Sequence, residues 1–249
     1  MRFSGKKDKV DETSLAVDDP IGFSIFARLI AYQKKSLSIT NFDIMKHYTL
    51  ADIMNLERRF RGKLLNCMSG VKSANLIGTK STFGSLNLAV FNSVHHIGAN
   101  PPYLGFILRP TTVPRHTFQN IQDTQYYTIN AITTSMYASA HQTSAKYAAD
   151  RSEFEAVGLT PVFRDDFHAP YVAGSPIQIG LQLEETHLIR CNDTIQVIGK
   201  ILQLYLPENS VAEDGSFDLS AQEVVGIGGL DTYYQVQRLE QLKYAKVKA

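Results

Sequence analysis

The sequence has no tryptophan and only two cysteines, Cys67 and Cys191, among its 249 residues. The cysteines lie far apart, and no CxxC or Cys/His spacing surrounds either of them. Paired thiols in metal sites and redox motifs need such close spacing, so we expect two reduced, partly buried thiols rather than a disulfide or a redox pair.

An excess of charge and a long apolar run are also missing. The 25 basic and 24 acidic residues give a net charge of +1, so no global field attracts nucleic acid or an anionic membrane. No apolar stretch approaches the roughly 20 residues that span a bilayer. No apolar run follows the basic residues of the N-terminus, so we expect no secretion signal. We therefore expect a cytoplasmic protein with neither a membrane nor a nucleic-acid partner.

The first 44 residues differ in texture from the rest. Charged and polar residues crowd the first twenty, and residues 21–32 are typical of one amphipathic helix after the start signal Asp18-Asp19-Pro20. We predict a domain over residues 45–249. Residues 1–44 form an extension, and two hypotheses stay open for it: a disordered segment, or a stretch upstream of a start at Met45 that is not part of the native domain.

Short apolar runs broken by Gly, Ser, Asn and Pro dominate the domain, which predicts many strands and few helices. Helices are expected from Thr49, as an N-cap, through Phe60, over 115–123, and as a helix or helical loop over 133–149. Strands are expected over 64–68, 75–79, 86–94, 103–108 and 126–132, and residues 177–189 and 195–206 predict a long hairpin. This pattern indicates a barrel or a sandwich rather than a doubly wound sheet.

The common catalytic and nucleotide motifs are missing. The chain contains no Walker loop, no GxGxxG after a strand and no GxSxG elbow. The glycines of 226–229 predict a tight bend. His95 and His96 are adjacent, so in a strand they point to opposite faces, and no metal site is expected.

Residues 76–130 contain an ordered series of motifs. A strand ends in Thr79, Gly84 sits in a turn, and the strand Asn87-Leu88-Ala89-Val90-Phe91-Asn92-Ser93 follows. Pro101-Pro102 precedes the next strand, and Arg115-His116-Thr117-Phe118-Gln119-Asn120-Ile121 opens a helix. Further along stand the segments of 152–161 (SEFEAVGLTP) and 197–201 (VIGKI), and then Gly228-Gly229 with Tyr233. In this order the motifs resemble the flavin reductase-like family of FMN-binding proteins over residues 45–236.

The resemblance implies a β-rich (all-β or α+β) FMN-binding split β-barrel with a few peripheral helices. It implies a homodimer with FMN as cofactor and NAD(P)H as co-substrate, in which nicotinamide gives a hydride to the flavin. A partner monooxygenase or another acceptor then takes the electrons. Two alternatives stay open: a flavoredoxin-like electron carrier that does not oxidise NAD(P)H, and a split-barrel protein that binds something else or nothing. In the reductase and in the carrier the flavin carries the chemistry, and no side chain need be catalytic.

The same resemblance assigns the cofactor-binding residues. Arg115 and Thr117, at a helix start, are expected to hold the phosphate, with Arg109 or Thr111 as further candidates. The backbone of Asn87–Ser93 is expected to line the flavin ring, although Leu88 and Phe91 also fit plain core packing. Asn92 stands where many members carry Ser. Further candidates are Thr79, Asn120, Ser144 and Lys146, and His141 is expected to border the nicotinamide.

Overall fold

The computed structural model describes residues 45–148 and 150–247. The chain divides into two compact units with a boundary between Leu56 and Glu57, and each is described by itself. The amphipathic helix expected over residues 21–32 and both hypotheses about residues 1–44 lie outside the described residues. The predicted domain boundary near Met45 stays a prediction.

In the first unit, α2 (Leu50–Asn55) begins at the N-cap that the sequence predicts. Thr49 and Asp52 form a capping box: the Asp52 carboxylate accepts from the Thr49 backbone N–H at 2.8 Å, and Thr49 Oγ1 accepts from the Asp52 N–H at 3.2 Å. The helix ends before Leu56, whose backbone is extended, so it stops earlier than predicted.

The second unit begins with α3 (Arg58–Cys67), and here one prediction is wrong. Residues 64–68 were expected as a strand, but residues 64–67 are helical and Met68 is the C-cap. The Glu57 carboxylate accepts from the Phe60 N–H at 2.9 Å and so starts a new helix that continues through the apolar run. A short apolar run alone does not distinguish a strand from a helix turn.

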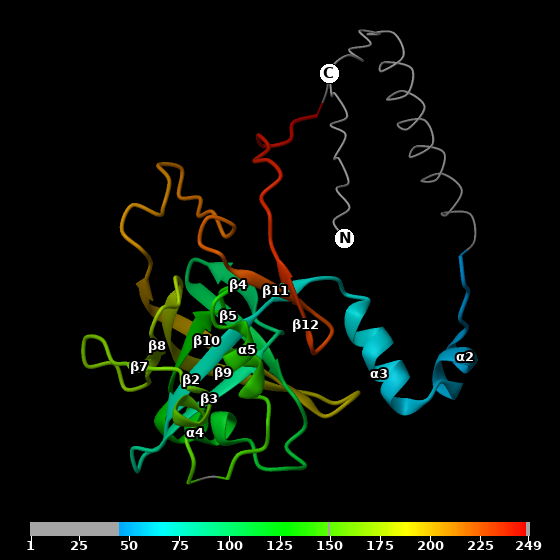
Figure 1. Ribbon diagram of the computed structural model, residues 1–249, viewed down its shortest axis with the longest axis horizontal. Coiled ribbons are helices and arrows are strands. Elements are labelled where there is room, and N and C mark those ends of the chain that lie inside the picture. Colours follow the sequence, from blue (N-terminus) through cyan, green and yellow to red (C-terminus); the bar gives the residue numbers. More distant parts are fainter. Residues whose placement is uncertain (1–44, 149, 248–249) are drawn as a thin grey trace, which may run out of the picture. The chain divides into compact units, whose positions relative to one another are not determined.

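The main sheet has seven antiparallel strands in the order β3-β2-β6-β9-β10-β5-β4. Figure 1 labels all of these strands except β6. These strands are β2 (Asn75–Lys80), β3 (Leu86–Phe91), β4 (His95–Ala99), β5 (Pro102–Leu108), β6 (Tyr126–Ala131), β9 (Gln178–Ile189) and β10 (Thr194–Tyr205). The expected β-rich fold and the long hairpin, formed by β9 and β10, are confirmed. Strand β4 was not predicted.

Short strands form two smaller sheets. One has the order β1-β11-β12, with β1 (Lys72–Ser73), β11 (Val225–Gly228) and β12 (Thr232–Gln235), and the other pairs β7 (Pro161–Val162) with β8 (Tyr171–Val172). The prediction of a bend over residues 226–229 is therefore wrong for residues 226–228. Gly226 to Gly228 lie in β11, and the turn begins at Gly229, whose φ of +63° suits glycine.

Three helices pack against the β2–β3 side of the sheet: α4 (His116–Thr124), α5 (Tyr137–Gln142) and α6 (Glu153–Val157). The helix predicted over 115–123 is confirmed. Of the predicted segment 133–149 the structure describes residues 133–148, and within them only α5 is helical, with turns and loop after it. Among the described residues, none of the helices has the length and apolarity needed to cross a membrane.

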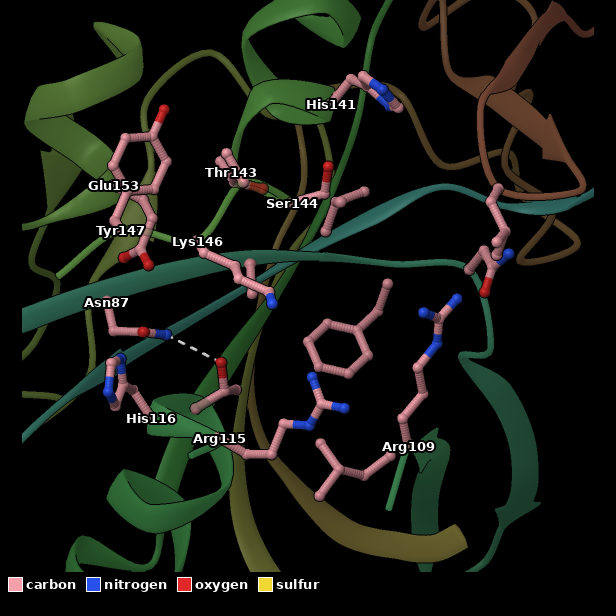
Figure 2. Close-up of a pocket in the computed structure, with 18 of the residues that line it drawn as sticks. Asn87, Arg109, Arg115, His116, His141, Thr143, Ser144, Lys146, Tyr147 and Glu153 are labelled. Carbon is pink, nitrogen blue, oxygen red and sulfur yellow. Dashed lines mark hydrogen bonds between the residues drawn. The ribbon is translucent and has the colours of Figure 1, made fainter. Parts of the chain in front are cut away.

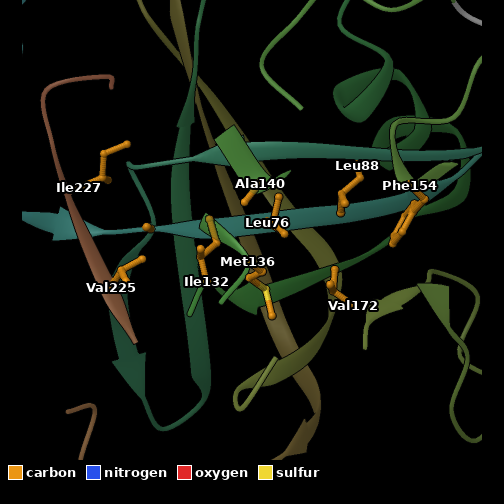
Figure 3. Packing of buried hydrophobic residues seen from close by; sticks show 10 residues of the cluster. Leu76, Leu88, Ile132, Met136, Ala140, Phe154, Val172, Val225 and Ile227 are labelled. Carbon is orange, nitrogen blue, oxygen red and sulfur yellow. The ribbon is translucent and has the colours of Figure 1, made fainter. Parts of the chain in front are cut away.

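Buried side chains form two main clusters on opposite faces of β2. Ile77 packs with Phe106, Tyr127 and Val197 in one cluster. Its neighbour Leu76 packs in the other, with Leu88 and Phe154 (Figure 3). Successive strand residues point to opposite faces, which explains the split.

Both cysteines are free thiols, and this part of the expectation is confirmed. They are exposed rather than partly buried. Cys67 is the last residue of α3, and Cys191 lies in the turn of the β9–β10 hairpin, where core packing does not reach.

Candidate functional site

A pocket of about 880 Å³ lies along β3, between the start of α4 and the segment that follows α5. The end of β5 and the turn between β11 and β12 complete its wall. Of the residues predicted from sequence, the structure brings the following to this one pocket: Asn87, Ala89, Val90, Phe91, Asn92, Ser93, Arg109, Arg115, Thr117, His141, Ser144 and Lys146.

Four predicted residues do not line the pocket. Leu88 is fully buried in the core cluster, which agrees with the alternative of plain core packing. Thr79 Oγ1 accepts from the Asn120 amide at 3.0 Å, so this buried pair joins α4 to β2. Thr111 is exposed in the loop after β5.

The start of α4 forms the basic part of the pocket. Arg115 occupies the N-cap position, but its side chain makes no hydrogen bond to the N–H groups of the first turn. Its Nε and Nη2 atoms instead both donate to the Pro110 carbonyl at 3.3 Å. These bonds hold the guanidinium beside the first turn, where unpaired N–H groups and the helix dipole favour an anion. Arg109 and Lys146 extend into the same space from the end of β5 and the segment after α5 (Figure 2).

Strand β3 forms one wall and is an edge strand of the main sheet. The Leu88 N–H, on the edge away from β2, donates to the buried Glu153 carboxylate at 3.1 Å. Asn87 donates from its amide to Thr117 Oγ1 at 2.9 Å (dashed line in Figure 2). The strand is thus tied to both α6 and α4, and its position relative to the helix start is fixed.

Beyond the end of β3, the chain is tied to the turn between β11 and β12. The Asn92 amide donates to the Gly229 carbonyl at 2.6 Å. On the other side of the same turn, Lys63 of α3 pairs with Asp231 at 3.0 Å. Ser93 Oγ donates to the Ile107 carbonyl at 3.0 Å and accepts from the Ile107 N–H at 3.1 Å, which joins this wall to β5.

The pocket carries an excess of positive charge. Arg109, Arg115 and Lys146 line it, against the carboxylates of Glu153 and Asp231. Because Asp231 is already paired with Lys63, Glu153 alone offsets the three cations, and an excess of two positive charges remains. This balance suits a ligand with two negative charges.

Sequence reasoning missed several residues of the wall. Glu153 stands inside the motif of residues 152–161, where nothing marks it as a site residue, although it reaches the β3 backbone and the pocket. Leu230 and Asp231 also line the pocket, and their only signal in the sequence is that they directly follow the Gly228-Gly229 motif. Tyr147 and His116 stood beside predicted residues, and no pattern set them apart.

Comparison with known proteins identifies the family. The family model described as a flavin reductase-like domain matches residues 68–221, which is more than half of the chain. The chain belongs to the flavin reductase-like family. The resemblance inferred from the ordered motifs is confirmed.

Solved structures agree with this assignment. A protein of Shewanella frigidimarina, described as a flavin reductase with a split barrel domain, is 48% identical, with a TM-score of 0.78 over 81% of this chain and 100% of that one. The expected split barrel is confirmed. Nitrilotriacetate monooxygenase component B of Bacillus cereus, 18% identical, shares the fold with a TM-score of 0.69 over 80% of this chain and 99% of that one.

One curated relative also matches this flavin reductase-like chain. It is an uncharacterised protein of Halalkalibacterium halodurans, 26% identical over 110 residues, which are 43% of this chain. The match spans about half (53%) of that relative's length.

Proposed function

We propose that this chain binds FMN in the pocket along β3 and acts as an NAD(P)H-dependent flavin reductase. The observation that carries the proposal is the pairing of a basic helix start with an edge strand in one pocket of a flavin reductase-like fold.

The residues present fit the chemistry of FMN. A phosphomonoester carries a charge of about −2 at neutral pH, which matches the excess of two positive charges. Arg115 and Thr117 at the start of α4, with Lys146 opposite, supply a guanidinium, a hydroxyl and an ammonium for its oxygens. Ala89, Val90 and Phe91 offer a mainly apolar wall for a flat ring.

Bound FMN would supply the capacity to accept a hydride from a reduced nicotinamide. The protein's part is position and electrostatics. The Asn87–Thr117 and Leu88–Glu153 bonds tie β3 to α4 and α6, so the groups that would contact the phosphate and the ring are held in position relative to each other. The cations keep the phosphate end ionised.

We also propose that the protein is a homodimer, as the family resemblance implies. What supports it is the outward face of β4, β5 and β10, which carries Ile97, Gly105 and Ile198 and against which no helix of the second unit packs extensively. Ile97 is 41% exposed there. A cytoplasmic location, expected from the patterns that the sequence lacks, and an electron-accepting partner, implied by the resemblance, remain predictions.

The spectrum of the purified protein tests the central proposal. We expect flavin absorbance, and fast bleaching when NADH or NADPH is added without oxygen. A flavin that persists for minutes with both nucleotides would identify an electron carrier instead. A protein that binds no added FMN would contradict the whole proposal.

Arg115→Ala tests the phosphate assignment. Loss of a charge-assisted contact should weaken FMN binding by about 1.5–3 kcal/mol, measured by fluorescence titration. Arg190→Ala, in the exposed turn of the β9–β10 hairpin, is the matched control and should leave the affinity unchanged. Equal affinities for both variants would refute the role of Arg115.

A further inference from the structure

His141 and Tyr233 form a pair at the rim of the pocket. His141 lies in the last turn of α5 and lines the pocket, and Tyr233 belongs to β12. The Tyr233 hydroxyl lies 3.4 Å from His141 Nδ1, and the two rings meet edge to face at 5.7 Å with an interplanar angle of 89°. The hydroxyl and the ring of Tyr233 therefore both contact the imidazole and set its orientation (Figure 2 shows His141 at the rim).

The groups around the pair favour one direction for its hydrogen bond. Burial raises the pKa of Tyr233 to about 12, so its hydroxyl keeps its proton at neutral pH. That proton has no other acceptor among the described residues. If the hydroxyl donates, Nδ1 accepts through its lone pair, and a neutral imidazole then carries its proton on Nε2.

The remaining neighbours do not compete for Nδ1. Tyr137 of α5 packs on Tyr233 with ring centroids 5.5 Å apart and makes no hydrogen bond to His141. The nearby carboxylate is Asp231, whose pKa is lowered by its hydrogen bond to Lys63, with a smaller contribution from His141. The Lys63 ammonium holds that carboxylate at 3.0 Å.

We propose that Tyr233 is a positioning residue: it fixes His141 in the Nε2–H tautomer, so that His141 donates a hydrogen bond to an acceptor oxygen of a ligand in the pocket. The ligand half rests on the proposed function, because the oxygen belongs either to the flavin nucleotide or to the nicotinamide substrate. The tautomer half concerns the protein alone.

Nitrogen-15 NMR of the histidine side chains, recorded without ligand at mildly alkaline pH where imidazoles are neutral, tests the tautomer directly. His141, assigned from the peak lost in His141→Gln, should show the Nε2–H pattern. His95 provides an opposite reference in the same spectrum, since its Nδ1 lies 2.9 Å from the Ser93 carbonyl, which can only accept. An Nδ1–H pattern for His141 would overturn the proposal.

Tyr233→Phe keeps the ring and removes the hydroxyl. We expect His141 to become a mixture of tautomers in this variant. Tyr137→Phe is the matched control, because it removes a hydroxyl from the neighbouring ring, and the spectrum of His141 should stay as in the parent protein. An unchanged Nε2–H pattern in Tyr233→Phe would show that Tyr233 does not position His141.

The same two variants test the ligand half. In Tyr233→Phe we expect at least a several-fold increase either in the Kd for FMN, which assigns the oxygen to the flavin nucleotide, or in the KM for NAD(P)H with kcat retained, which assigns it to the nicotinamide substrate. Tyr137→Phe should change neither. If both constants are unchanged in Tyr233→Phe, the ligand half is wrong. If the parent protein binds no FMN, the proposed function fails while the tautomer result stands by itself.

Discussion

The side-chain amide of Asn87 donates to the hydroxyl of Thr117 at 2.9 Å, and this buried bond joins β3 to the first turn of α4. It connects the two parts of the pocket that contribute its strand wall and its basic helix start. Both partners belong to the protein itself, so the bond has a measurable consequence for stability.

Asn87→Ala should lower the free energy of unfolding by about 1–3 kcal/mol, because it leaves Thr117 without its buried partner. A double-mutant cycle with Thr117→Val, followed by urea denaturation without flavin, isolates the bond itself. We expect a coupling energy of about 1 kcal/mol. A coupling energy of zero would mean that the bond does not hold β3 to α4.

Tyr127 and Tyr171 predict opposite results for the same substitution. Both rings are fully buried. The Tyr127 hydroxyl is buried without a hydrogen-bond partner among the described residues, whereas Tyr171 donates to Gln203 Oε1 at 2.7 Å. Tyr127→Phe should therefore raise the free energy of unfolding by about 1 kcal/mol, and Tyr171→Phe should lower it by about as much. Thermal or urea unfolding checks both, and equal losses in the two variants would contradict this reading.

Ile97→Glu tests the proposed dimer. A charge on the outward face of β4 should dissociate the dimer, because burying an unpaired carboxylate at an interface is costly. Leu219→Glu, on a loop residue of similar exposure (47%), should leave it intact. Sedimentation velocity measures both; a monomeric parent protein, or a dimer that survives Ile97→Glu unchanged, would count against this surface.

Two aspartates in the loop before β11 predict an effect of acid. Hydrogen bonds from Ser216 and Ser220 lower the pKa of Asp214 and of Asp218, respectively, to about 2. A carboxyl whose pKa is lower in the folded than in the unfolded protein stabilises the fold at any pH above its unfolded-state pKa. This contribution is lost as the pH falls through the folded-state pKa of about 2. Ser220→Ala should raise the pKa of Asp218 toward 3.8, seen by carboxyl-carbon NMR titration. An unchanged titration curve would show that Ser220 is not the main cause.

The sequence predicted the sheet and the general place of the pocket because both depend on local patterns. Strands β2, β5 and β6 follow runs of apolar and β-branched residues, and Arg115 stands at a recognisable helix start. Ordered motifs then carried the family resemblance. That resemblance supplied what spacing could not, namely that segments as far apart as Asn87 and Lys146 line one pocket.

Other features depend on contacts that no local pattern records. Glu153 reaches the backbone of Leu88, 65 positions away. Any residue except proline at position 88 would offer the same N–H group, so the sequence contains no complementary side chain that would reveal the contact. Residues 64–67 became helical because of the Glu57 cap outside the run. Gly226 and Gly228 are strand residues because β11 pairs with β1 on one side and β12 on the other, and this pairing depends on the tertiary structure.

Strand β3 ends the order of the main sheet, and among the described residues no other strand pairs with its outer edge. Unpaired strand edges can be templates on which another polypeptide adds a strand, and such addition leads to aggregation. Glu153 occupies only the Leu88 N–H on that edge. A ligand lying along β3 would therefore also act as a steric guard for the sheet, and the flavin-free protein should be the more aggregation-prone form during storage and expression.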